Sequence, residues 1–492
     1  WPSGDRRGLM FWRGVWGYLP ANVIQGLVGF LTLVLFTRLL SPDDFGRYAV
    51  AYAVFSLTHV AVFTWIEAAM ARFWAAESQG PSLADHFAGL YQATFALTLL
   101  FLPVMGLAIW LWPMDMAFRI AVAAGVAGVP IRCLARLVQE RYRASGEVAK
   151  SAWMDIFTSV GGLGFGVVFA LLGAGAASPL IGLGLAPLVL LPFVLPAELK
   201  FARGGRADPQ RLLSYARYGY PIAVSLTLTL VLSSTDRILL AVFLDEAATG
   251  AYHAAYSLAN RTLDVLFIWL GAAGGPALVM ALERHGPAGL KEAAREQAST
   301  FLLIGIPAAV GLALVARPMA EFMIGEDLRG AAAAITPWIA FAALMSGLSS
   351  YYFGQAFTLG KRTSLLFVTM AIPALANVIL NLILIPFFGV MGAAWATAAS
   401  LGLGLTSVIL IGRRVVALPI PLDSLIRIVV ASVAMAAVVM VLPSPGGFVE
   451  LMLDAGVGAV VYGLVAITLN AAAVRDVLVD RFRRLKARRA PA

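Results

Sequence analysis

Residues 218–247 read YGYPIAVSLTLTLVLSSTDRILLAVFLDEA, and this stretch decides the fold class. Between Tyr218 and Leu244 only Asp236 and Arg237 carry a charge. Roughly 20 helical residues cross the hydrocarbon core of a bilayer, so the stretch is long enough for one crossing. A single crossing segment must be a helix, because lipid cannot satisfy the backbone N–H and C=O groups. We therefore expect a membrane-spanning helix that contains two costly charges.

Similar apolar runs make up most of the chain. Its 492 residues are 60% hydrophobic and only 13% charged, whereas soluble domains average about 25% charged residues. We expect an all-α polytopic membrane protein with about fourteen transmembrane helices, each as long as one crossing requires. The predicted spans are 14–39, 48–71, 87–112, 117–138, 151–173, 179–199, 218–243, 251–280, 298–316, 332–357, 364–386, 390–412, 425–442 and 452–474.

The formal net charge of +9 is divided unevenly between the two sets of loops. Most of the loops predicted to be cytoplasmic are basic, with residues such as Arg141, Lys150, Lys200 and Arg203, whereas the opposite loops are acidic or neutral, such as SPDDFG at 41–46. Basic loops remain on the cytoplasmic side of a membrane. We therefore expect a bacterial cytoplasmic (inner) membrane protein with both termini in the cytoplasm. Its surplus cations should contact anionic membrane lipids, and no nucleic-acid partner is expected.

An internal repeat divides the chain. Residues 46–52 and 250–256 both follow the pattern G-x-Y-x-x-A-Y, at an offset of 250 − 46 = 204. Six predicted spans separate the copies, and an even number leaves the two halves parallel in the membrane, as in transporters with a central cavity between lobes. We expect an N-lobe of six helices at 1–200, a C-lobe of six helices at 201–416, two additional spans at 417–475 and a basic cytoplasmic tail at 476–492.

Three stretches resemble a known family. They are TRLLSPDDFGRYAVAYAVFSL at 37–57, STDRILLAVFLDEAATGAYHAAYSLANR at 234–261 and ALANVILNLILIPFFGVMGAAWATAAS at 374–400. The most specific pattern is N-x-x-x-N followed by I-P-x-F-G-x-x-G-A-A-x-A-T, from Asn377 to Thr397. The chain resembles Wzx-type polysaccharide flippases of the multidrug/oligosaccharidyl-lipid/polysaccharide (MOP) exporter superfamily.

The resemblance implies a function in surface polysaccharide biosynthesis. Such a flippase moves a lipid-linked oligosaccharide of the undecaprenyl-pyrophosphate type from the inner to the outer leaflet by alternating access. A positively charged central cavity accepts the anionic headgroup. A polysaccharide polymerase and glycosyltransferases are further candidate partners. The protein itself is then not an enzyme and has no catalytic residues.

Three intramembrane arginines are the candidates for the substrate headgroup: Arg132, Arg237 and Arg261. Arginine suits a pyrophosphate because its planar group donates paired hydrogen bonds and remains charged. Each has a structural alternative. Arg132 could extend to the lipid headgroups, and Arg237 and Arg261 could form interhelix pairs, with Asp236 and Arg261 paired across a hairpin.

Five further residues are candidate gate or coupling groups: Asp236, Asp264, Glu67, Asp155 and His59. A carboxylate inside the membrane must be paired or protonated. Asp155 could instead be a charge partner near a helix end, paired with Arg132 or Arg136, and His59 a hydrogen-bonded packing residue. Asn377 and Asn381 are four residues apart and so lie on one helix face, where their amides could bond across a lobe interface.

No metal site or organic cofactor is predicted, and a coupled proton or sodium ion is left open. Cys133 is the only cysteine. Other functions remain open as well. They are a cation-coupled multidrug exporter of the same superfamily, a flippase for a peptidoglycan lipid precursor, a non-transporting membrane subunit of a polysaccharide-synthesis complex, and an integral-membrane glycosyltransferase.

Overall fold

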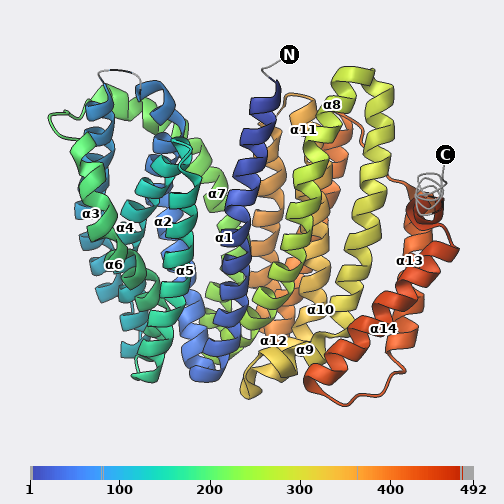
Figure 1. The fold of residues 1–492 in the computed structure, drawn as a ribbon. Coiled ribbons are helices and arrows are strands. Elements are labelled where there is room, and N and C mark those ends of the chain that lie inside the picture. Colours follow the sequence, from blue (N-terminus) through green and yellow to red (C-terminus); the bar gives the residue numbers. More distant parts are fainter. Residues whose placement is uncertain (1–3, 79, 81, 363, 477–478, 480–492) are drawn as a thin grey trace, which may run out of the picture. The chain divides into compact units, whose positions relative to one another are not determined.

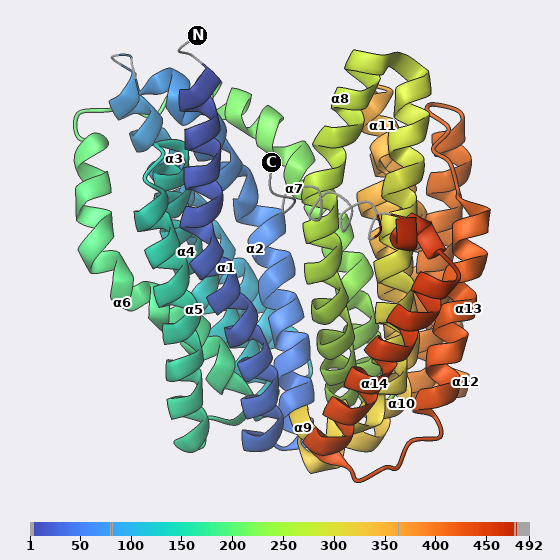
Figure 2. The same ribbon diagram turned by 45° about the vertical axis from the view of Figure 1, so that its right-hand side comes forward.

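The computed structural model describes residues 4–78, 80, 82–362, 364–476 and 479, without the side chains of 4–19, 233, 272 and 273. This part of the chain is helical and contains no strand. It forms two compact units, Trp1–Gly250 and Ala251–Ala492 (Figures 1 and 2). The all-α prediction is therefore confirmed. The predicted tail at 476–492 lies outside the described residues except for Asp476 and Val479.

The first unit contains seven long helices. They are α1 (Gly4–Leu39), α2 (Pro42–Glu77), α3 (Leu83–Leu111), α4 (Met116–Ala144), α5 (Val148–Leu171), α6 (Ser178–Phe201) and α7 (Pro209–Phe243). Three of these helices, α2, α4 and α7, begin at side chains that accept a backbone hydrogen bond. Ser41 accepts from Asp44 at 3.2 Å, and Asp115 accepts from Phe118 at 2.7 Å. These caps explain why α2 and α4 begin directly after short polar turns.

Glycines allow the helices of the first unit to approach closely. A Cβ atom on Gly182 of α6 would lie 2.1 Å from the carbonyl oxygen of Gly162 on α5. A Cβ on Gly219 of α7 would lie 2.6 Å from the carbonyl oxygen of Trp65 on α2. Small residues at helix contacts are the usual means of association inside a membrane, because van der Waals packing replaces the hydrophobic effect there. In Figure 1, α1 and α5 also lie side by side.

The second unit contains α8 to α14. They are α8 (Glu246–Leu314), α9 (Ala316–Met323), α10 (Glu326–Leu348), α11 (Gln355–Leu359), α12 (Leu365–Arg413), α13 (Leu422–Val439) and α14 (Gly447–Thr468), with a π-helical turn at Ser349–Phe353. α8 and α12 are each two helices joined at a glycine. Gly286 has φ of 62° and Gly389 has φ of 58°. Glycine adopts this left-handed region without the strain of a side chain, so it permits the break.

The last two helices pack against the rest of the second unit. The Tyr462 hydroxyl of α14 donates to the carbonyl of Leu303 on α8 at 2.6 Å. Leu302 on α8, Ile428 on α13 and Ala466 on α14 share one buried apolar cluster. α13 and α14 also contact each other, and α14 contacts α9 (Figure 2). These two predicted additional spans are thus integral to the unit.

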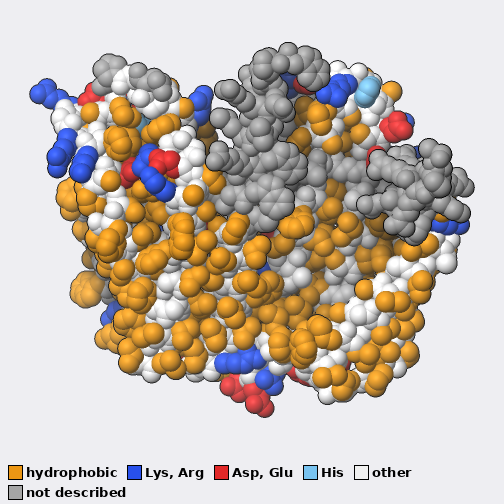
Figure 3. All heavy atoms as spheres, in the orientation of Figure 1, with side chains coloured by type: hydrophobic (Ala, Val, Ile, Leu, Met, Phe, Trp, Pro, Cys, Tyr) orange, Lys and Arg blue, Asp and Glu red, His pale blue; other side chains and the backbone are white. Residues whose placement is uncertain are grey.

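The described residues contain eleven helices long and apolar enough to cross a membrane, or up to twelve if the bent α7 pair is one span. α8 and α12 each count once in that number although a glycine divides each of them. The predicted fourteen spans therefore stay a prediction. On the first unit, Figure 3 shows apolar side chains over the middle of the helices and Lys and Arg near their ends. This distribution is that of a multi-pass membrane protein.

Candidate functional site

Arg132 lies on α4 of the first unit, against α2. Its guanidinium carbon is 5.4 Å from the centroid of the Phe55 ring, and Phe55 is only 2% exposed. Within the described residues Arg132 forms no hydrogen bond and no ion pair with another side chain. A cation over an aromatic face is stabilised by the ring quadrupole. The arginine is thus positioned by a ring, and its five N–H donors remain for a ligand.

Two further predicted residues lie beside this arginine. Nε2 of His59 is 3.0 Å from Oε1 of Glu67, and both side chains are largely buried, at 10% and 13% exposed. The rings of Phe55 and His59 are 6.4 Å apart, and the charge of Arg132 is attracted by Glu67. The structure therefore brings Arg132, His59 and Glu67 into one cluster, which we name the α2–α4 cluster and which also includes Phe55.

The contact between His59 and Glu67 is close, but it leaves polar atoms of both side chains without a hydrogen-bond partner among the described residues. It is not aligned as a hydrogen bond, and Nδ1 of His59 has no hydrogen-bond partner among the described residues. Buried polar atoms without a partner are uncommon and often mark functional positions. Phe55 was not among the sequence candidates. The sequence nevertheless indicates that Phe55 lies next to His59, because the two are four residues apart and so share one face of a helix.

Asp155 lies outside this cluster, in an ion network at the ends of α4 and α5. Its carboxylate is 3.1 Å from Nη2 of Arg143 and 3.8 Å from Nη1 of Arg136. Arg143 also contacts Glu140 at 2.8 Å. With two arginines around it, Asp155 has the contacts of a structural charge partner, the alternative that the sequence left open.

Asp236 and Arg237 are buried on α7, at 0% and 7% exposed. The helix bends by 45° between Leu232 and Ser234, directly before them. Both residues interact with other parts of the chain. Interrupted helices at mid-membrane are where transporters build their binding sites. The bend of α7 therefore lies directly beside Asp236 and Arg237, the only charged residues of this predicted span.

The second unit holds Arg261 and Asp264 on α8. Arg261 is exposed, and Asp264 accepts a hydrogen bond from Nδ2 of Asn260 at 2.5 Å. Asp236 belongs to the first unit and Arg261 to the second. Their predicted pairing therefore stays a prediction.

Asn377 and Asn381 are fully buried on α12. Nδ2 of Asn381 donates to the carbonyl of Asn377 at 2.9 Å, and Nδ2 of Asn377 is 3.4 Å from Oγ1 of Thr397. The hydroxyl of Tyr252 lies 2.9 Å from the same threonine oxygen. Asn377 thus joins the two halves of α12 through Thr397, and Thr397 in turn contacts α8 within the second unit. A role at an interface between lobes stays a prediction.

Comparisons with known proteins agree with this architecture. The family model of "Polysaccharide biosynthesis protein" matches residues 35–333. A structure titled "Lipid II flippase MurJ, inward closed conformation" is similar with a TM-score of 0.76 at 15% identity, covering 94% of this chain and 99% of the other. An inward-facing multidrug resistance MATE family transporter of the MOP superfamily has a TM-score of 0.64 at 13% identity, covering 80% and 95%.

A search of curated proteins finds no match. At these low identities the structural likenesses establish the fold, whereas the family model covers more than half of the chain. The chain therefore belongs to the family of polysaccharide biosynthesis proteins and has the fold of the MOP superfamily.

Proposed function

We propose that the protein flips a polyprenyl-pyrophosphate-linked oligosaccharide from the inner to the outer leaflet of the bacterial cytoplasmic membrane. The observation that carries this proposal is Arg132, a cation within a membrane-spanning helix that has an aromatic ring but no counter-ion side chain among the described residues. A charge inside a membrane is costly and usually marks a ligand pathway. The family and the fold support the same function.

The α2–α4 cluster suits an exchange of anions. Arg136 repels the charge of Arg132 and Glu67 attracts it from a distance, without forming an ion pair with it. A pyrophosphate would contact the arginine directly through paired hydrogen bonds, which are stronger than a longer-range attraction. The arriving phosphate and the Glu67 carboxylate then repel each other, so protonation of the His59–Glu67 pair would favour the bound state. This gives the pair a role as the coupling group for a proton.

The membrane potential could supply the work. An interior-negative potential is worth about 2.3 kcal/mol per charge per 100 mV, and it favours outward movement of an anion. A proton bound together with the substrate would move outward with it and would offset one charge of this gain. Asp236 and Arg237, beside the bend of α7, and Asp264 and Arg261 on α8 are the remaining proposed gate and headgroup residues.

A peptidoglycan lipid precursor is the second candidate substrate. The similar structure whose title names a Lipid II flippase favours it, with a TM-score of 0.76. Both substrates present a pyrophosphate on a polyprenyl chain, so the same arginine serves either. They differ in the sugars, and a comparison of transport rates for the two lipids separates them.

The test is translocation of a lipid-linked oligosaccharide in proteoliposomes under an imposed potential. Wild type should transport, Arg132→Ala should lose transport, and Arg132→Lys should retain only part because lysine lacks the planar paired donors. Arg72→Ala is the matched control, since Arg72 also lies over an aromatic ring, that of Phe73 at 5.9 Å, but is exposed near the end of α2. Equal transport by wild type and Arg132→Ala would refute the proposed site. Absence of transport by folded wild type would favour a non-transporting subunit.

A further inference from the structure

A second site of different chemistry lies on the face of the first unit formed by α4, α5 and α6. A groove of about 410 Å³ opens there, within the size range of small-molecule sites. Its walls are apolar except for one amine and one phenol. The lining residues are Tyr142, Ala149, Lys150, Trp153, Met154, Phe157, Leu190 and Val194.

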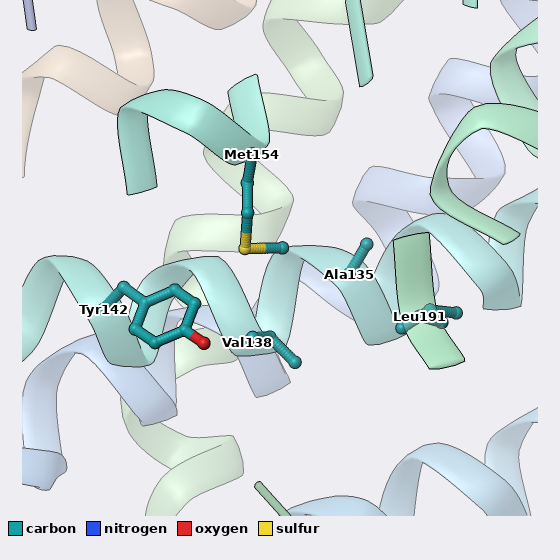
Figure 4. Packing of buried hydrophobic residues seen from close by; sticks show 5 residues of the cluster. All are labelled: Ala135, Val138, Tyr142, Met154 and Leu191. Carbon is teal, nitrogen blue, oxygen red and sulfur yellow. The ribbon is translucent and has the colours of Figure 1, made fainter. Parts of the chain in front are cut away.

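The floor of the groove is a packed cluster. Met154 extends from α5 toward Tyr142 and Val138 of α4, and Leu191 of α6 completes the layer with Ala135 (Figure 4). Four of these five side chains are at most 6% exposed, and Tyr142 is 7% exposed. Side chains that are already packed need no reordering when a ligand binds. The groove is thus largely preformed, as ligand sites usually are.

The rim residues have one end in water and one in hydrocarbon. Lys150 is 62% exposed, forms an ion pair with Glu147 and lies 5.4 Å from the centroid of the Tyr142 ring. Trp153, one turn further along α5, is 69% exposed. Lysine, tyrosine and tryptophan of this kind are typical of the boundary between the bilayer and water.

Further cations lie at the same end of the first unit. α6 runs antiparallel to α5, so its last residue lies near the start of α5. Lys200 and Arg203 are exposed there and have no ion pair in the described part of the chain. Because Lys150 has three N–H donors and Glu147 accepts only one contact from it, two donors remain for an anion.

We propose that this groove binds a glycerophospholipid with an anionic headgroup. One acyl chain lies on Phe157, Leu190 and Val194, and the phosphate contacts Lys150 at the rim. Both the hydrocarbon around the groove and the charge at its rim favour this occupant. The groove opens between membrane-spanning helices, where hydrocarbon chains fill apolar space, and the cationic rim selects a lipid with net negative charge. The site is separate from Arg132 and does not depend on the transport function.

Native mass spectrometry of the full chain, released from nanodiscs of equal parts phosphatidylglycerol and phosphatidylcholine, tests the proposal. Wild type should retain phosphatidylglycerol with about fivefold enrichment, the size expected for one cation near an anionic surface. Lys150→Gln should abolish the enrichment. Val194→Trp should fill the groove and remove the retained lipid while leaving Lys150 and its ion pair in place.

Two matched controls distinguish the groove from general lipid contact. Val168→Trp adds the same bulk to an exposed position of α5 outside the groove, and Lys291→Gln removes an exposed lysine from α8. Both should retain phosphatidylglycerol as wild type does. Equal retention in wild type, Lys150→Gln and Val194→Trp would overturn the proposal. Displacement of the retained lipid by equimolar undecaprenyl phosphate would also overturn the proposal, because the groove would then prefer an isoprenoid lipid to a glycerophospholipid.

Discussion

The guanidinium carbon of Arg132 lies 5.4 Å from the centroid of the Phe55 ring. The two residues belong to α4 and α2, and no carboxylate of the described residues forms an ion pair with Arg132. An aromatic ring holds a cation without neutralising it. A salt bridge would hold it as firmly but would occupy the donors that a pyrophosphate needs. Because its partner is a ring and not a carboxylate, Arg132 is a candidate for binding an anionic ligand.

We expect Phe55→Leu to weaken substrate binding while preserving the fold. A desolvated cation–π contact is worth about 0.5–2 kcal/mol, which corresponds to a roughly two- to thirtyfold rise in the half-saturating substrate concentration. Transport titrations in proteoliposomes measure this value. Phe63→Leu is the control, because Phe63 is a buried α2 residue whose ring contacts Phe101 and no cation. A similar rise in both variants would attribute the effect to packing alone.

Replacing Glu67 should change both substrate binding and proton coupling. Glu67→Gln removes the carboxylate that contacts His59. We expect tighter binding of the anionic substrate, because no carboxylate then opposes the phosphate, and transport that no longer responds to an imposed proton gradient. His59→Gln should remove the same response, and transport into proteoliposomes with and without the gradient measures both effects. A response that is unaltered in both variants would remove the pair from the coupling step.

The loop between α4 and α5 should lose stability in acid. Burial tends to raise the pKa of Glu147, but hydrogen bonds from Lys150 and Ser145 and the charge of Arg141 outweigh it, so the pKa lies below its usual value. A lowered carboxyl pKa stabilises the fold above the unfolded value of about 4.3, and this contribution is lost as the pH falls through the folded pKa.

The melting temperatures of wild type and Glu147→Gln measure this contribution. Wild type should be the more stable at pH 7, and the difference should shrink as the pH falls below about 4. Asp476→Asn serves as the control, because Asp476 lies far along the chain in an exposed position. A difference that stays constant between pH 7 and pH 3 would contradict the assigned cause.

Two glycines of the first unit should respond oppositely to alanine. A Cβ on Gly182 would lie 2.1 Å from the carbonyl oxygen of Gly162, so Gly182→Ala must separate α5 from α6. Overpacking of this kind costs about 1–3 kcal/mol. Gly164 has no atom within 4 Å of the added carbon, and Gly164→Ala should be neutral or stabilising because glycine costs about 0.5–1 kcal/mol inside a helix. Thermal unfolding in detergent compares the two, and equal melting temperatures would refute the packing argument.

Part of the site was visible before the structure. Arg132, His59 and Glu67 each stood out because a charged or polar side chain inside an apolar run is costly and therefore informative. Phe55 did not, since an aromatic residue in such a run is ordinary. Asp155 was expected to pair with Arg132 or Arg136, and it contacts Arg136, but its closer contact with Arg143 depends on how α4 and α5 face each other.

The sequence by itself determined the all-α class, the membrane location and the repeat, whereas the tertiary structure decided which side chains meet. Hydropathy and loop charge are local, because each helix satisfies its own backbone and meets lipid independently of its neighbours. Contacts such as Arg132 with Phe55, or Tyr252 with Thr397, depend on the rotation of one helix against another. That rotation is set by side-chain packing and by close glycine contacts such as Gly182 with Gly162, which involve residues of different helices at once.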